Sequence, residues 1–277
     1  MTFGTRLGTV FGDSGHLCVG IDPHPYLLED WGLTDDAAGV REFGLRVVDA
    51  TAGRAGIVKP QVAFFERHGS AGFAALEDVL AAARAADLLV IGDAKRGDIG
   101  STFDAYAQAW LTPGSPLEVD ALTVSTFLGI DSIASTRALA EANGKGLFIL
   151  AATSNPEASS LQLAIEAAGV TVAAGIVNRV QEWNATADVL GSMGVVLGAT
   201  VALDAYGIAS SSLASTPILA PGFGHQGAQF ADIAEIYGNA AGNVLVSASR
   251  SILAAGPGEV AFAITTQAAE VAGALVA

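Results

Sequence analysis

Apolar runs of strand length recur along the chain at regular intervals. Each is rich in Val, Ile, Leu or Ala and is bounded by Gly, Pro or a polar residue, which is the pattern of a buried strand. Most of the intervals between the runs hold Ala-rich amphipathic stretches of helical length. The pattern predicts eight strands, at residues 17–22, 56–61, 88–95, 121–125, 146–154, 194–200, 217–222 and 243–249.

Eight strand and helix units in a chain of 277 residues predict a (β/α)8 TIM barrel. A doubly wound open sheet is the alternative, but it normally carries a Gly-rich fingerprint after its first strand, and "GIDPHP" is not one. The interval between residues 154 and 194 is unusually long. Its segment "LQLAIEAAGVTVAAGIVNRVQEW" predicts a small hairpin leading into a helix, which is an insertion after strand five. Because no linker divides the chain, we expect one domain over residues 1–277.

Composition narrows the class of protein. The chain is 51% hydrophobic and carries a formal net charge of -15 with only 13 Lys and Arg, which argues against nucleic acid or an anionic membrane as a partner. The single cysteine, Cys18, cannot form an intrachain disulfide, and the first residues lack the apolar core of a signal peptide. The four histidines show no metal-ligand spacing. We therefore expect a cytoplasmic protein without a metal site.

A charged run follows the third predicted strand, where residues 91–102 read "IGDAKRGDIGST". Side chains alternate along a strand, so Asp93 and Lys95 are predicted to share one face and to be buried together, at several kcal/mol per ion unless well paired. Two interpretations stay open at this point. The pair serves chemistry, or it is a structural ion pair and Asp98 or Ser101 caps the following helix.

Polar residues fall at the carboxyl ends of most of the predicted strands, where barrels of this kind have their active sites. They are Asp22, Lys59, Asp93, Lys95, Ser154 and Arg250. Two later stretches suit an anion: "APGFGHQG" at 220–227 offers bare backbone N–H groups and Gln226, and "SASRSIL" at 247–253 sets Arg250 where a helix should begin. Loops after strands seven and eight are the usual phosphate site of the barrel, so the sequence predicts a phosphate-binding rim.

These motifs resemble the orotidine 5'-phosphate decarboxylase family. The sequences "LCVGIDP", "VKPQ", "DAKRGDIGST", "TSNP", "PGFGHQG" and "SASRSI" occur in the family's order over residues 17–252, and the insertion is similar to that of its longer-chain bacterial branch. The resemblance implies conversion of orotidine 5'-monophosphate (OMP) to UMP and CO2 without a cofactor, by a homodimer.

The resemblance also implies roles for individual residues. Lys59, Asp93, Lys95 and Asp98 would form an alternating charged tetrad, with Asp98 and Thr102 reaching the neighbouring subunit's site. The substrate-binding residues would be Asp22 on the ribose, Ser154 on the pyrimidine, and Pro221, Gln226, Ser249 and Arg250 around the phosphate. Ser249 stands where the family commonly has glycine, which puts the fit of that loop in doubt.

The implied reaction explains a charged strand end. Loss of CO2 from C6 leaves a carbanion outside the π system, so a fixed ammonium, assigned to Lys95, must stabilise it and then protonate it. Other interpretations are a Mg2+-dependent sugar-phosphate decarboxylase or aldol synthase with the same D-x-K-x-x-D strand, and a noncatalytic nucleotide sensor, which has no reason to bury a tetrad. An adhesion role for Arg96-Gly97-Asp98 is disfavoured because the chain has no secretion signal.

Overall fold

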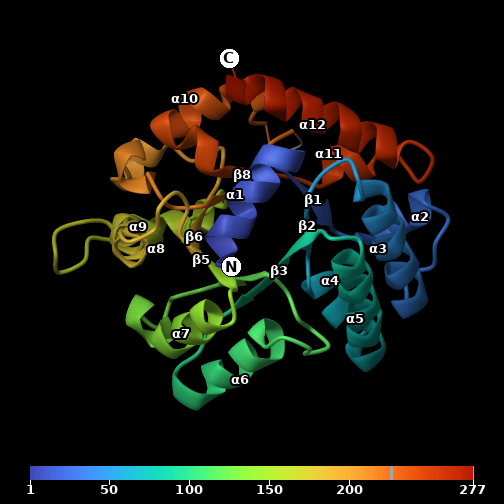
Figure 1. Cartoon of the computed structure of the whole chain (residues 1–277), viewed down its shortest axis with the longest axis horizontal. Coiled ribbons are helices and arrows are strands. Elements are labelled where there is room, and N and C mark those ends of the chain that lie inside the picture. Colours follow the sequence, from blue (N-terminus) through green and yellow to red (C-terminus); the bar gives the residue numbers. More distant parts are fainter. Residues whose placement is uncertain (225–226, 277) are drawn as a thin grey trace.

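Eight parallel strands close into a barrel in the computed structural model, which describes residues 1–224 and 227–276 (Figure 1). Each strand pairs with the next along the chain, and β1 pairs with β8 to complete the ring. The strands are β1 (Leu17–Ile21), β2 (Ile57–Pro60), β3 (Leu89–Arg96), β4 (Ala121–Val124), β5 (Gly146–Ala152), β6 (Met193–Leu197), β7 (Ile218–Pro221) and β8 (Val244–Ala248). All eight predicted strands are confirmed, and so is the TIM barrel.

Helices surround the barrel because each interval between strands buries its apolar stripe against them (Figure 1). The α-helices are α1 (Phe3–Ser14), α2 (Pro25–Asp30), α3 (Ala37–Thr51), α4 (Ala63–Glu66), α5 (Gly69–Ala85), α6 (Gly100–Leu111), α7 (Ala134–Ala142), α8 (Ser159–Gln162), α9 (Val172–Trp183), α10 (Ile233–Tyr237), α11 (Arg250–Leu253) and α12 (Val260–Val276). Short 3-10 turns are η1 (Ile130–Ile133), η2 (Pro156–Ala158), η3 (Leu203–Tyr206), η4 (Ser210–Leu213), η5 (Phe230–Asp232) and η6 (Gly238–Asn243). Within the described ranges, none of the helices combines the length and apolar character needed to span a bilayer.

The insertion after β5 has the predicted form. A single antiparallel bridge joins Ile165 to Thr171, and α9 follows at once. The segment between α8 and α9 projects from the ring of helices in Figure 1. Thr171 begins α9 by accepting a hydrogen bond from the backbone N–H of Ala174 at its side-chain oxygen.

Alternation along the strands separates two apolar layers. Leu17, Val19 and Ile21 of β1 face the surrounding helices, whereas Cys18 lies in the cluster that fills the barrel. On β3, Leu89 and Ile91 belong to that inner cluster. Asp93 continues the same period-two face of β3, so the inner face turns from apolar to charged at the carboxyl end of the barrel.

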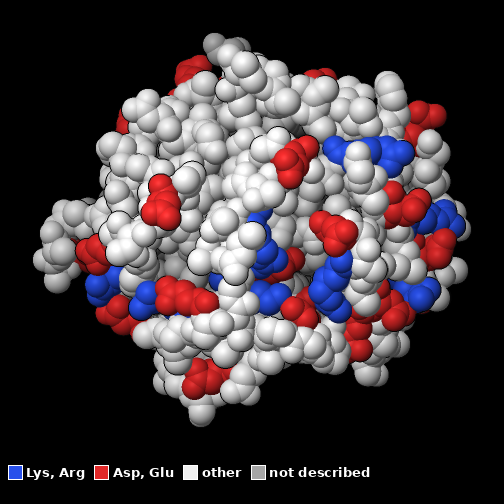
Figure 2. Space-filling model, viewed as in Figure 1, with Lys and Arg blue, Asp and Glu red and all other residues white. Residues whose placement is uncertain are grey.

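The helix α1 closes the opposite, amino-terminal end of the barrel and crosses the centre of the view in Figure 1. Its Phe3 and Leu7 are buried in the inner cluster, and the ring of Phe3 meets Phe148 of β5 edge to face, with centroids 6.0 Å apart. In Figure 2, which has the same viewpoint, Lys and Arg side chains lie beside Asp and Glu side chains around the middle of this face. Among the described residues, α1 thus packs into the amino end of the barrel, whereas a pocket opens on the inner face at the carboxyl end.

Candidate active site

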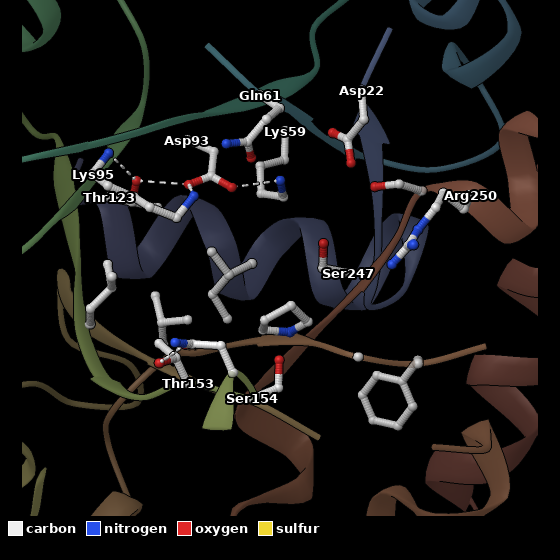
Figure 3. Close-up of a pocket in the computed structure, with 18 residues that line it drawn as sticks. Asp22, Lys59, Gln61, Asp93, Lys95, Thr123, Thr153, Ser154, Ser247 and Arg250 are labelled. Carbon is white, nitrogen blue, oxygen red and sulfur yellow. Dashed lines mark hydrogen bonds and ion pairs between the residues drawn. The ribbon is translucent and has the colours of Figure 1, made fainter. Parts of the chain in front are cut away.

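A pocket of about 390 Å³ opens at the carboxyl ends of the strands (Figure 3). It brings together eight residues that were expected there from the sequence, namely Asp22, Lys59, Asp93, Lys95, Ser154, Pro221, Ser249 and Arg250. Gln226 and the neighbouring His225 lie outside the described residues. The carboxyl-end rim thus collects most of the predicted site from strands far apart in the sequence.

Two ammonium groups flank one buried carboxylate at the bottom of this pocket. Lys59 Nζ donates to Asp93 Oδ2 at 2.8 Å, and Lys95 Nζ donates to Asp93 Oδ1 at 2.5 Å. Thr123 of β4 donates its hydroxyl to Asp93 Oδ1 at 3.0 Å. Lys59, Asp93 and Lys95 form a charged row, which Figure 3 shows with Lys95 at one end, beside Thr123, and Lys59 toward the middle of the pocket. The row presents fixed positive and negative charge side by side.

The row shifts the pKa values of its buried members strongly. Burial alone would raise the pKa of Asp93, but Lys59 and Lys95 outweigh it and hold that pKa well below its usual range. Burial would lower the pKa of Lys59, but the negative charges of Asp93 and Asp22 outweigh burial and raise it above its usual value. Both groups are therefore charged throughout the neutral pH range.

Lys95 differs from the prediction in its burial. Its side chain is 46% exposed, whereas those of Asp93 and Lys59 are 10% and 7% exposed. The partner desolvated with Asp93 is therefore Lys59, and the expectation that Asp93 and Lys95 are buried together was wrong for Lys95. The reason is a register shift of β3 against β4 between Gly92 and Arg96, which turns the strand outward at the pocket.

The backbone at Lys95 is strained. Its φ is +48°, in the left-handed region that non-glycine residues avoid at about 1–2 kcal/mol. The backbone N–H of Lys95 donates to Thr123 Oγ1 at 2.9 Å, and Thr123 in turn binds Asp93. Thr123 therefore stabilises the strained backbone of Lys95 and also orients the Asp93 carboxylate. The strained conformation directs the Lys95 ammonium over the pocket.

Asp22 and Arg250 lie at the other side of the pocket from Lys95 in Figure 3. Asp22 Oδ1 is buried and accepts no hydrogen bond from any described residue. Arg250 opens α11 as expected, but α11 is a single turn, so the helix offers only its first N–H groups to an anion. Across the described residues the guanidinium of Arg250 forms no ion pair, although the side chain lines the pocket.

Ser249 fits its loop because the facing strand provides room. A Cβ atom on Gly20 of β1 would lie 1.8 Å from Ser249 Oγ and 2.8 Å from its Cβ. The hydroxymethyl group of Ser249 therefore occupies the space that a side chain at position 20 would need. The doubt about the bulk of Ser249 is resolved by this glycine on the neighbouring strand.

Sequence reasoning missed two polar groups that contact the charged row. Thr123 is one, and the other is Gln61, which follows Lys59 by two positions and so lies on the same face of its strand. With its amide nitrogen toward Asp93, Gln61 donates to Oδ2 at 2.5 Å and accepts from Lys95 Nζ at 3.3 Å. The spacing of Lys59 and Gln61 was a usable signal, whereas Thr123 comes from another strand and needed the register.

Asp98 and Thr102 do not line the pocket of their own chain. Asp98 is half-buried, and the one hydrogen bond found for its carboxylate within the described residues comes from the adjacent N–H of Ile99 at 2.8 Å. Thr102 is exposed in the first turn of α6. The N-cap residue of α6 is Ile99, and no side-chain capping hydrogen bond forms there. The alternative in which Asp98 or Ser101 caps this helix was therefore wrong.

The described part of the chain contains no cluster of three or more His, Cys, Asp or Glu side chains able to hold a metal ion. In the pocket, Asp93 of β3 pairs with Lys59 of β2 and with Lys95 of its own strand.

Comparison with known families and proteins agrees on one identity. The family model described as "Orotidine 5'-phosphate decarboxylase / HUMPS family" matches residues 15–263. The curated orotidine 5'-phosphate decarboxylase of Salinispora tropica is 50% identical over 261 residues, which are 94% of this chain and 93% of that protein. That of Corynebacterium efficiens is 47% identical over 277 residues, 98% of both chains.

Solved structures agree as well. A crystal structure from Streptomyces avermitilis, assigned to orotidine 5'-phosphate decarboxylase, superposes with a TM-score of 0.95 at 46% identity over 100% of this chain and 96% of that one. The OMP decarboxylase of Leishmania donovani gives a TM-score of 0.81 at 29% identity, with 100% of both chains covered.

Proposed function

Because the chain belongs to the orotidine 5'-phosphate decarboxylase / HUMPS family, we propose that its charged row decarboxylates OMP by stabilising a carbanion at C6 of the pyrimidine. Membership at about half identity over nearly the whole chain makes it a carboxy-lyase of pyrimidine biosynthesis. The observation that carries the mechanism is the row of Lys59, Asp93 and Lys95 at the bottom of an open pocket.

The reaction breaks the bond between C6 and the carboxylate carbon. CO2 leaves as a neutral molecule, the electron pair stays on C6, and an N–H of the Lys95 ammonium donates its proton to that carbon. The half-exposed Lys95 supports this role, because its ammonium reaches the pocket while Asp93 and Thr123 fix its strand end. Two like charges about 4 Å apart repel by roughly 4 kcal/mol at an effective dielectric near 20, so Asp93 beside the substrate carboxylate favours its departure.

The other side of the pocket would hold the ribose 5'-phosphate. Among the described residues, Asp22 Oδ1 is buried without a hydrogen-bond partner, which suits a ribose hydroxyl, and the Arg250 guanidinium forms no ion pair, which suits a phosphate. Gly222 and Gly224 adopt φ values of +114° and +70°, in the left-handed region that favours glycine, so the loop after β7 can turn tightly beside the pocket. Binding energy from this remote group then offsets repulsion at C6.

The activity test uses the purified chain with OMP in a metal-stripped buffer containing EDTA. We expect the absorbance change of OMP turning into UMP to continue at full rate in EDTA. A loss of activity that Mg2+ restores would contradict the proposal and favour the Mg2+-dependent sugar-phosphate chemistry that shares the D-x-K-x-x-D strand.

We also propose a two-fold dimer in which Asp98 and Thr102 complete the partner's site. Asp98 follows β3 but is not among the described residues that line the pocket of its own chain, and its carboxylate accepts a hydrogen bond from the adjacent N–H of Ile99. Large exposed apolar side chains stand on the neighbouring segments, from the start of α6 to the loop after β4, and they support an interface there. They are Ile99, Tyr106, Phe127 and Leu128, with exposed fractions of 59%, 40%, 75% and 54%.

Mixing two inactive variants tests the shared site. Subunits of Lys59→Ala and Asp98→Ala that re-pair would form hybrids in which one site has both residues, so random mixing restores roughly a quarter of wild-type sites. If Asp98 acts within its own chain, every site lacks one residue and the mixture stays inactive. The activity of the mixture relative to each parent is the measurement.

A further inference from the structure

The short helix α8 of the insertion is hydrogen-bonded to the loop that follows β5. Gln162, the last residue of α8, accepts a hydrogen bond from the backbone N–H of Thr153 at its Oε1, at 3.0 Å. Its Nε2 donates to Thr153 Oγ1, also at 3.0 Å. We propose that Gln162 is a positioning residue for pyrimidine recognition, acting on the substrate through the segment Thr153 to Asn155.

The orientation of α8 is the reverse of what hydrophobic burial would give. Leu161 and Leu163, on either side of Gln162, are 45% and 38% exposed, while the polar Gln162 is the part-buried one of the three. An apolar contact does not explain why this turn faces the barrel. The two hydrogen bonds to Thr153 do, because one amide satisfies both a backbone donor and a side-chain acceptor.

The segment Thr153 to Asn155 is stabilised by contacts from outside the sheet. The register of β5 against β6 shifts between Leu150 and Ala152, and β5 ends there, so Thr153 has no strand ladder to hold it. The hydroxyl of Thr153 donates a hydrogen bond to Asn155 Oδ1 at 2.8 Å, so the contact with Gln162 continues across Ser154. The conformation around Ser154 is therefore set by a relay that begins at Gln162.

Thr153, Ser154 and Asn155 all line the pocket, whereas Gln162 does not. Figure 3 shows Thr153 and Ser154 opposite the charged row. The inference rests on the proposed function, in which Ser154 contacts the pyrimidine. It assigns the insertion a part in the reaction: the insertion holds the base-binding side of the pocket, and Arg250 on the other side is independent of it.

The experiment compares two ligands that differ in the base. Binding of UMP and of ribose 5-phosphate is measured by calorimetry for the wild type and for Gln162→Met, which keeps the length of the side chain but removes both hydrogen bonds. We expect UMP affinity to fall roughly tenfold, the effect of two ordinary hydrogen bonds, with ribose 5-phosphate affinity unchanged. In OMP turnover, KM should rise with the loss of base binding.

Matched variants keep the test interpretable. Ser160→Ala removes a hydroxyl of the same short helix that bonds only to the Glu157 carbonyl, and it should change neither affinity. Gln162→Glu retains the acceptor for the Thr153 N–H but cannot donate to its hydroxyl, so an intermediate loss is expected. In a Thr153→Val background, Gln162→Met should have a smaller effect than in the wild type, because one of its two partners is already gone.

If Gln162→Met lowered the affinities for UMP and ribose 5-phosphate by the same factor, or changed neither, the inference would be wrong and Gln162 would be a structural residue. A wild-type protein that binds both ligands equally would instead overturn the assignment of Ser154 to the pyrimidine, and the inference with it.

Discussion

Two buried ion clusters lie at opposite ends of the same barrel, and each is built around one carboxylate. At the carboxyl end, Asp93 pairs with Lys59 and Lys95. At the amino end, Asp120 pairs with Arg6 of α1 at 2.6 Å and lies 3.7 Å from Lys145. The side chains of both carboxylates are 10% exposed.

The surroundings of the two carboxylates differ. Asp120 Oδ2 accepts from the backbone N–H of Val90, Lys145 also binds Glu118 at 2.6 Å, and α1 covers the cluster. Asp93 instead faces a pocket, and its partner Lys95 is strained and half-exposed. Burial and pairing are thus common to both clusters and do not identify a reactive site. The Asp93 cluster differs in its open pocket and in the left-handed backbone at Lys95, and these two features support the proposed chemistry there.

The largest expected effect separates the two clusters by activity. Lys95→Ala should lower kcat/KM for OMP by at least about 10³-fold, because it removes both the fixed charge and the proton donor. The free energy of unfolding should change by no more than about 1 kcal/mol, since the lost ion pair is half-exposed and Asp93 keeps Lys59 as its buried partner. Steady-state kinetics and urea unfolding measure the two quantities.

The matched variant at the other end is Lys145→Ala. It leaves Glu118 and part of Asp120 without a buried cation, so the free energy of unfolding should fall by about 3–5 kcal/mol. The kcat/KM of the folded fraction should stay at the wild-type value. If Lys145→Ala abolished turnover in the folded protein, or Lys95→Ala spared it, the distinction between the clusters would be wrong.

The second prediction concerns stability against pH. The pKa of Asp93 is lowered in the folded protein. Its contribution to the free energy of unfolding is therefore present above its ordinary pKa, near 4, and is lost as the pH falls below that value. Lys59 has a raised pKa, so its contribution is present below its ordinary pKa, near 10.4, and is lost as the pH rises. The double variant Lys59→Met/Asp93→Asn should therefore flatten the unfolding free energy at both extremes, by up to roughly 1.4 kcal/mol per pH unit at each.

Glu118 provides the contrast at the amino end. Burial would raise its pKa, but the hydrogen bonds from Lys145 and from the N–H of Gly114 lower it, so Glu118→Gln should flatten the acid side alone. Urea unfolding at intervals from pH 3 to pH 11 would show the profiles. An unchanged acid limb in the double variant would contradict the pairing of Asp93 described above.

The smallest expected effect compares one glycine at each end. Gly20→Ala should cost about 1–3 kcal/mol of stability, because its methyl group meets Ser249, and Ser249→Gly should recover most of that loss. Gly4 in α1 is the control: its Cβ would lie 2.1 Å from the carbonyl oxygen of Leu190, which no side-chain truncation removes. Thermal unfolding of the single and double variants measures the coupling. Equal costs for Gly20→Ala with and without Ser249 would refute the proposed contact.

Much of this molecule could be predicted from local sequence. Alternating or continuous apolar runs place all eight strands within three residues of their ends, because a buried strand needs such a run wherever it lies. The rim followed for the same reason: Lys59 and Asp93 continue inward-facing positions of their own strands, so the carboxyl ends of a barrel had to bring them together.

What the sequence could not determine depends on how distant segments meet. The register shift of β3 against β4 decided that Lys59, and not Lys95, is desolvated with Asp93, and it brought in Thr123. The grip of Gln162 on Thr153 joins an insertion helix to a strand end through one side-chain amide. Local periodicity shows which face a residue occupies, but pairing and burial are set by the register and packing of neighbouring segments, and these form only when the chain folds.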